Sequence, residues 1–271
     1  MRQIAKNVAR SARGVGLAVV TTLVISGCGA NGIPFDTSEP EPSSLRLADR
    51  AAAQGDHETA ATLYRREFTA NPDSVEALVG LGRSYRNLGQ SRRGEHALRE
   101  AASRREDDPR ILLELGRTQL ADGRATQALK TLDRAQAKAP RDLRIITARG
   151  IALDQLSRHD EAQRVYQNGL SIDPTDFALL SNLALSRGLS GAPEAGIEIL
   201  RELVRSSEAT GRTRGNLALL YGLAGREREA RATLAVDLDD AAIAENIAYY
   251  RDLREMLKAG RAIGDVTSGG A

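Results

Sequence analysis

The sequence contains no tryptophan and one cysteine, and aromatic residues make up 3% of its 271 positions. The single cysteine, Cys28, excludes a disulfide within the chain. Because aromatic side chains are so few, the buried surface has to come mainly from Ala, Leu, Ile and Val. Proline is also scarce, with eight residues, whereas glycine reaches 25. Several of these glycines recur at a fixed spacing.

A pattern of small and large residues recurs every 34 positions. The six frames begin at Glu41, Val75, Pro109, Leu143, Phe177 and Gly211. Positions 8 and 20 hold Ala or Gly in every frame, and position 24 holds Tyr or Leu. Position 15 is Gly in five frames and Ser157 in the fourth. The clearest copy is Ala77–Gln90, where Leu78, Leu81 and Tyr85 fall on one face of a helix that Gly89 ends.

This pattern predicts a helix–turn–helix unit. Small residues let the first (A) and second (B) helix approach closely, and the glycine makes the turn between them. One pair cannot bury its apolar face, so several copies have to stack. The spacing and residue types resemble the tetratricopeptide repeat. That resemblance implies an all-α solenoid of about six repeats over residues 44–239. An ordinary amphipathic helical bundle is the alternative.

Several residues depart from the family's pattern. Arg149 and Arg214 stand at positions that are usually apolar. Gln119 and Arg187 stand where an aromatic residue is usual, and Glu106 and Glu208 stand where proline is usual. Between Ser206 and Thr213 the regularity loosens, so we expect the last pair to run from about Arg214 to Leu234. A further helical pattern at 240–260 has no partner helix and is expected to cap the open end. We expect 261–271 to be disordered.

The N-terminus has the charge and hydropathy of an export signal. Basic residues over 1–14 precede an apolar run from Val15 to Ile25, which is too short for a bilayer span of ~20 residues. The run ends Ile25-Ser26-Gly27-Cys28, which resembles the lipobox of bacterial lipoproteins. The resemblance implies a signal peptide over 1–27, cleavage after Gly27 and lipidation of Cys28. An incidental thiol after an ordinary signal peptide is the alternative.

Residues 28–43 are rich in Gly, Pro, Ser and acid, a composition that is typical of a flexible tether. Gly29 follows the cysteine where an aspartate would favour the inner membrane in the lipoprotein family, so we expect an outer-membrane anchor with the repeats facing the periplasm. Four basic residues lie in the expected signal peptide, residues 1–27. Of the 38 basic residues, the other 34 face 36 acidic ones, which does not indicate a nucleic-acid-binding protein.

The sequence offers no pattern for catalysis, metal binding or a cofactor, and we predict a non-enzymatic protein. His57 and His159 share position 17 but are three repeats apart, so they cannot bind one metal ion, and we expect both to pack at the start of a B helix. His96 is the third histidine. Gly80-Leu81-Gly82 lies inside a helix rather than after a strand, which excludes a dinucleotide-binding loop.

A protein-binding groove is the remaining candidate site. The repeat family lines its concave face with positions 2, 5, 9, 12 and 13 of the A helices. We expect a groove that is basic in the middle and apolar toward the C-terminal end, lined by Arg83, Arg86, Asn87, Arg117, Arg144, Leu185, Leu189 and Leu219. A peptide or helix with acidic and apolar parts would complement it. A solvated charged face without a ligand is the alternative.

The C-terminal third carries a narrower resemblance. Asn216–Gly225, Asp237-Leu238-Asp239 and Ala244–Tyr250, together with the lipobox, resemble the TadD-like lipoproteins of tight-adherence (Flp) pilus assembly. The resemblance implies a non-enzymatic adaptor that helps assemble or localise the pilus secretin, with pilus components as protein partners. The alternative is a general periplasmic scaffold for outer-membrane protein insertion, cell-wall synthesis or polysaccharide export.

Overall fold

The computed structural model describes residues 43–261 and shows thirteen α-helices and no strand in that range. The expected signal peptide, the expected lipidation site Cys28, all but the last residue of the expected tether and the residues after Arg261 lie outside the described residues. Six antiparallel pairs and one single helix follow one another: α2 (Ser44–Ala53) with α3 (His57–Ala70), α4 (Val75–Asn87) with α5 (Ser91–Arg104), α6 (Pro109–Ala121) with α7 (Ala125–Lys138), α8 (Leu143–Gln155) with α9 (His159–Leu170), α10 (Phe177–Leu189) with α11 (Pro193–Leu203), α12 (Gly211–Leu223) with α13 (Glu227–Leu234), and finally α14 (Asp240–Lys258).

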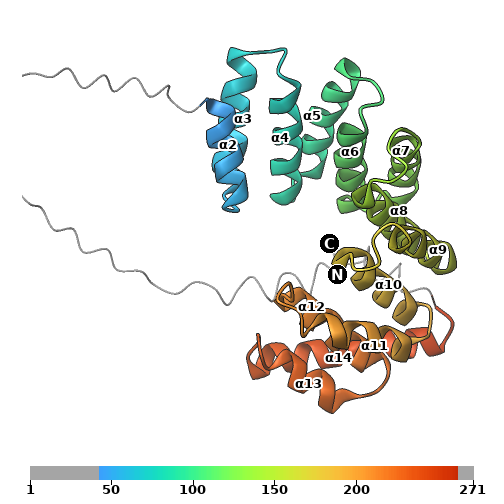
Figure 1. Cartoon of the computed structure of the whole chain (residues 1–271). Coiled ribbons are helices and arrows are strands. Elements are labelled where there is room, and N and C mark those ends of the chain that lie inside the picture. The colour runs from blue at the N-terminus through green and yellow to red at the C-terminus, as the bar shows by residue number, and fades with distance from the viewer. Residues whose placement is uncertain (1–42, 262–271) are drawn as a thin grey trace, which may run out of the picture.

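The all-α solenoid fold is confirmed. Each B helix packs on its own A helix and on the A helix that follows, and successive A helices from α2 to α12 also contact one another. Figure 1 shows the pairs stacked into a curved array, with α7 and α9 on its outer side and α8 and α10 nearer the inside. The A helices therefore line the concave face. None of the described helices is long and apolar enough to cross a membrane.

Polar side chains fix where the A helices begin. Ser74, Asp108, Asp142, Asp176 and Thr210 each accept a hydrogen bond from a backbone N–H in the first turn of the next helix. These caps recur every 34 residues, and each satisfies a donor that the helix leaves unpaired. Thr210 forms a reciprocal capping box with Thr213. Because of this box α12 begins at Gly211, three residues before the start that we expected from the irregular sequence at 206–213.

Close packing of small residues holds each pair together. A methyl group added at Gly82 would lie 2.4 Å from Leu98, and one added at Gly150 would lie 2.1 Å from the Tyr166 ring. The six large residues at position 24 are all buried. Five of the turns between A and B helices contain a glycine with positive φ, a conformation that glycine adopts without strain. In the fourth turn Ser157 takes the same conformation, with φ of 57°.

The apolar core is shared between neighbouring pairs. One buried cluster joins the first two pairs to Ile111 of the third, and another runs from Ala184 to Leu253 through the last two pairs and α14. On α14, Tyr250 is 1% exposed and packs directly on Gly222 of α12. The single helix therefore covers the apolar face that the sixth pair leaves open, as expected of a cap.

Candidate partner-binding groove

The middle of the concave face carries a cluster of arginines around one carboxylate. Arg86 of α4 and Arg117 of α6 both pair with Glu114 of α6, and the Arg117 contact measures 3.3 Å. Burial lowers the pKa of Arg117, and although Glu114 opposes this, the neighbouring Arg86 and Arg144 lower it further. Two guanidinium groups thus share one acceptor, and a third, on α8, is close enough to affect them. The cluster has more positive charge than its own carboxylate neutralises.

Exposed polar residues flank this cluster. Arg83 is exposed, lies 4.0 Å from Asp49 and also interacts with the hydroxyl group of Tyr64. Asn87 is also exposed, and its amide nitrogen lies 3.2 Å from His57 Nε2. Arg144 donates two hydrogen bonds of 3.0 and 2.6 Å to Asp142, and these raise the pKa of the guanidinium group. All five predicted polar residues of the groove thus lie on the A helices α4, α6 and α8.

The predicted apolar end of the groove is different. Leu185 and Leu219 are each 5% exposed and belong to the C-terminal core cluster, so they offer almost no surface to a partner. The reason is that α10, α12 and α14 pack tightly together, and the apolar side chains between them are needed for that packing. Leu189 is partly buried and lines a pocket beside the turn after α10 instead.

The three histidines lie apart, and His57 and His159 each begin a B helix. His57 lies beside Asn87, and His159 Nδ1 is 2.8 Å from an oxygen of Asp154. His96 is exposed on α5. Within 43–261 there is no group of three or more side chains suited to hold a metal ion.

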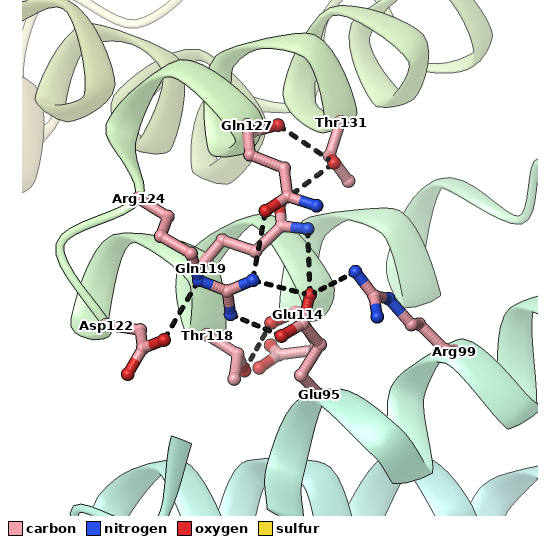
Figure 2. A network of polar contacts seen from close by, with 9 residues as sticks. All are labelled: Glu95, Arg99, Glu114, Thr118, Gln119, Asp122, Arg124, Gln127 and Thr131. Carbon is pink, nitrogen blue, oxygen red and sulfur yellow. Dashed lines mark hydrogen bonds and ion pairs between the residues drawn. The ribbon is translucent and has the colours of Figure 1, made fainter. Parts of the chain in front are cut away.

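Sequence reasoning missed a buried polar network between the second and third pairs, which Figure 2 shows. Gln119, which replaces the usual aromatic, is 2% exposed and donates to Glu95 at 3.4 Å. Thr131 donates to the Gln119 oxygen at 2.9 Å, and Arg124 pairs with both oxygens of Glu95. Burial alone would raise the pKa of Glu95, but the hydrogen bonds from Arg124 and Gln119 outweigh it and the pKa is lowered. Buried groups that are satisfied in this way stabilise one arrangement of the two pairs.

Two other polar residues at unusual positions, Arg149 and Arg214, also have partners. Arg149 donates to Asp133 at 2.6 Å, and Arg214 makes two hydrogen bonds of 2.6 Å to Asp237. Both arginines stand at positions that the repeat pattern reserves for apolar side chains. The carboxylate that each one meets lies on the B helix of the preceding pair or just after the last B helix. Ion pairs therefore replace apolar contacts at these positions.

Comparison with known proteins agrees with the fold. Tetratricopeptide-repeat family models match residues 45–89, 79–142 and 143–176. Residues 45–176 are tetratricopeptide repeats. The pairs that follow, up to α13, repeat the same helix–turn–helix geometry, so the solenoid continues beyond the matched segment.

Solved structures and a curated relative are consistent with this family. A thermophilic tetratricopeptide-repeat protein of Thermus thermophilus is 22% identical with a TM-score of 0.59, over 65% of this chain and 96% of that one. A tetratricopeptide-repeat protein of Parabacteroides merdae ATCC 43184 is 14% identical with a TM-score of 0.66, over 79% and 86%. At this identity they show the fold alone. The uncharacterized protein y4yS of Sinorhizobium fredii (strain NBRC 101917 / NGR234) is 32% identical over 100 residues. These cover 37% of this chain and 55% of that relative's length.

Proposed function

We propose that this protein is a non-enzymatic, lipid-anchored adaptor that holds an acidic segment of another envelope protein against its concave face. Tetratricopeptide repeats are protein-interaction scaffolds, and no enzyme family is indicated for the chain. The observation that carries the proposal is that Arg86 and Arg117 in the groove share one carboxylate, Glu114, and each contacts one of its two oxygens. A carboxylate of the partner would supply the second acceptor that these two guanidinium groups lack.

Charge rather than apolar contact is expected to select the partner. Among the described residues, the large apolar side chains classed as exposed are Leu47 and Val236, with exposures of 36% and 67%. Because Leu185 and Leu219 are buried, the groove has much less apolar surface than the sequence predicted. Long-range attraction between a basic groove and an acidic segment also raises the association rate, and salt weakens it.

The narrower proposal is a role in tight-adherence pilus assembly. The resemblance to that lipoprotein family lies in Asn216–Gly225, Asp237–Asp239 and Ala244–Tyr250. These segments belong to α12, to the connection before α14 and to α14, which pack together in one core cluster. We propose that Cys28 anchors the chain in the outer membrane, that the repeats face the periplasm, and that the partner is the pilus secretin or a protein that acts with it.

Site-specific crosslinking tests the groove. A photo-crosslinking amino acid at Arg83, which is exposed on α4, should capture the secretin or another pilus component in cells. The same probe at Arg92, exposed on the B helix α5, is the matched control and should not. Adding Arg117→Glu should abolish the Arg83 product, because the reversed charge repels an acidic segment. Capture from Arg92 but not from Arg83 would contradict binding in the groove.

Fractionation tests the anchor. Cys28→Ser should release the protein from the membrane while the helix content by circular dichroism is unchanged, because Cys28 lies outside the solenoid. A variant that stays in the membrane fraction argues against lipidation. Normal piliation in a strain that lacks this protein would contradict the role in pilus assembly. If the crosslinked partner belongs instead to outer-membrane protein insertion, cell-wall synthesis or polysaccharide export, the general envelope scaffold is the correct function.

A further inference from the structure

Two adjoining pockets of about 560 and 460 Å³ follow the edge of the array where the turns between A and B helices meet the end of α14. They share Gly191 and Leu257 as lining residues. The first is lined by the turns after α8 and α10 and by the last residues of α14. The second is lined by the turn after α12 and by Arg254 and Lys258.

The length of α14 creates this edge. A methyl group added at Gly188 of α10 would collide with Leu220 of α12, and one added at Gly222 of α12 would collide with Tyr250 of α14. Tyr250 therefore takes the place in α14 that Leu220 takes in α12. The helix α12 ends at Leu223, whereas α14 continues to Lys258, more than a turn further relative to the same contact. The extra helical turn places Leu257 beside the loops that follow α8 and α10.

The pockets combine apolar and basic side chains. Leu189 and Leu257 are both partly buried and line the first pocket. Five basic and two acidic residues line the two pockets together. Arg158 is bonded to Glu161, and Arg254 and Lys258 pair with glutamates outside the pockets, which leaves Arg164 and Arg261. Arg164 and Arg261 are exposed and form no salt bridge with any described residue, although the charge of Arg164 helps to lower the pKa of Glu161. The site therefore suits a short segment with an acid between apolar side chains.

Such a segment follows directly in this chain. Arg261 lines the first pocket, and the next ten residues read AIGDVTSGGA. Ile263 and Val266 are their only large apolar residues, and Asp265 is their only charge. Extended, ten residues reach ~33 Å, so the pocket lies within reach. A tether this short also gives an effective concentration on the order of millimolar, which no free partner matches at ordinary protein levels.

We propose that residues 262–271 dock in this edge pocket, with Ile263 against Leu189 and Leu257 and with Asp265 toward Arg164. The proposal is independent of the groove residues on α4, α6 and α8 and of the pilus role, because the pocket is lined by the turns after α8 and α10, the start of α9 and the end of α14. The docked segment covers the two leucines and gives Arg164 a carboxylate of its own, because the nearby Glu161 is already bonded to Arg158.

Tryptophan fluorescence tests the proposal, because the chain has no tryptophan of its own. In the full-length chain carrying Ile263→Trp, the indole should emit at shorter wavelength than in denaturant and resist quenching by acrylamide. Adding Arg164→Glu should weaken both effects, because Arg164 is exposed and its replacement does not disturb the core. Val236→Asp, which changes an exposed residue elsewhere, is the matched control and should leave both unchanged. Circular dichroism checks that each variant is folded.

Three outcomes overturn the proposal. The first is emission and quenching of the folded Ile263→Trp protein equal to those in denaturant. The second is a blue shift that Arg164→Glu leaves unchanged, because the segment would then lie elsewhere. The third is a blue shift that disappears on dilution, because the segment of a second copy would then fill the pocket.

Discussion

Gly150→Ala tests the close approach of paired helices most directly. Alanine is favoured over glycine inside a helix by ~1 kcal/mol, so an open site would be stabilised. Here the added carbon would lie 2.1 Å from Cε1 of Tyr166, whose ring is fully buried. The ring cannot swing away easily, because its hydroxyl donates to Asp154 at 2.8 Å. Overpacking typically costs ~1–3 kcal/mol, and a contact this short against a held ring favours the upper half of that range. With the gain of ~1 kcal/mol subtracted, we expect a net loss of ~1–2 kcal/mol.

Thermal unfolding followed by circular dichroism measures this loss. For a solenoid of this size, 1 kcal/mol corresponds to ~2–4 °C, so the expected drop in Tm is ~2–8 °C. Gly211→Ala is the matched control, because an added carbon there finds its nearest neighbour at 3.5 Å, an ordinary contact. Its Tm should stay within ~1 °C of the parent or rise.

A second background shows whether Tyr166 is the cause. The next pair contains Ala184 and Leu200 at the same two positions, and both are fully buried there. In a chain that carries Tyr166→Leu, Gly150→Ala should therefore cost less than it does in the parent, with a coupling of ~1 kcal/mol or more. If Gly150→Ala is harmless, or costs the same in both backgrounds, close packing against the ring does not limit this position.

Two further predictions concern the turns and the buried network. Ser157→Gly should raise the free energy of unfolding by ~0.5–1 kcal/mol in urea titrations, because Ser157 has φ of 57° where the other turns use glycine. Glu95 has a pKa below its usual value of 4.5, so its contribution is complete above that value and is lost as the pH falls through the lower folded pKa. Glu95→Gln should therefore lower stability at pH 7 and flatten its loss below pH ~4.5, whereas an unchanged pH profile contradicts this role.

The spacing of small residues was enough to predict the fold. The distance between two packed helices limits the size of the residues at positions 8, 20 and 24. The spacing of small and large residues therefore indicates which helices pack together. The start of each A helix was also readable, because Ser74, Asp108, Asp142, Asp176 and Thr210 recur every 34 residues. Thr210 in this series would have placed the start of α12 at Gly211 rather than at about Arg214.

Polar residues at apolar positions could not be interpreted in the same way. The repeat pattern marks Gln119, Arg149 and Arg214 as departures, but it does not show which residue of a neighbouring pair faces each one. Their partners Glu95, Asp133 and Asp237 lie 16 to 24 residues away and on different elements. Only the superhelical packing of the pairs brings the partners together, and a single sequence does not report its geometry.

The groove shows why position alone does not define a binding surface. Position 9 faces inward in every repeat, yet it holds an exposed Arg83 near one end and a buried Leu219 near the other. What decides between surface and core is which side chains surround the position: Leu219 packs in the apolar cluster that α10, α12 and α14 share, whereas Arg83 stays exposed on α4. Binding capacity is therefore expected to concentrate around Arg86 and Arg117, where the A helices carry charges that cannot all be neutralised within the fold.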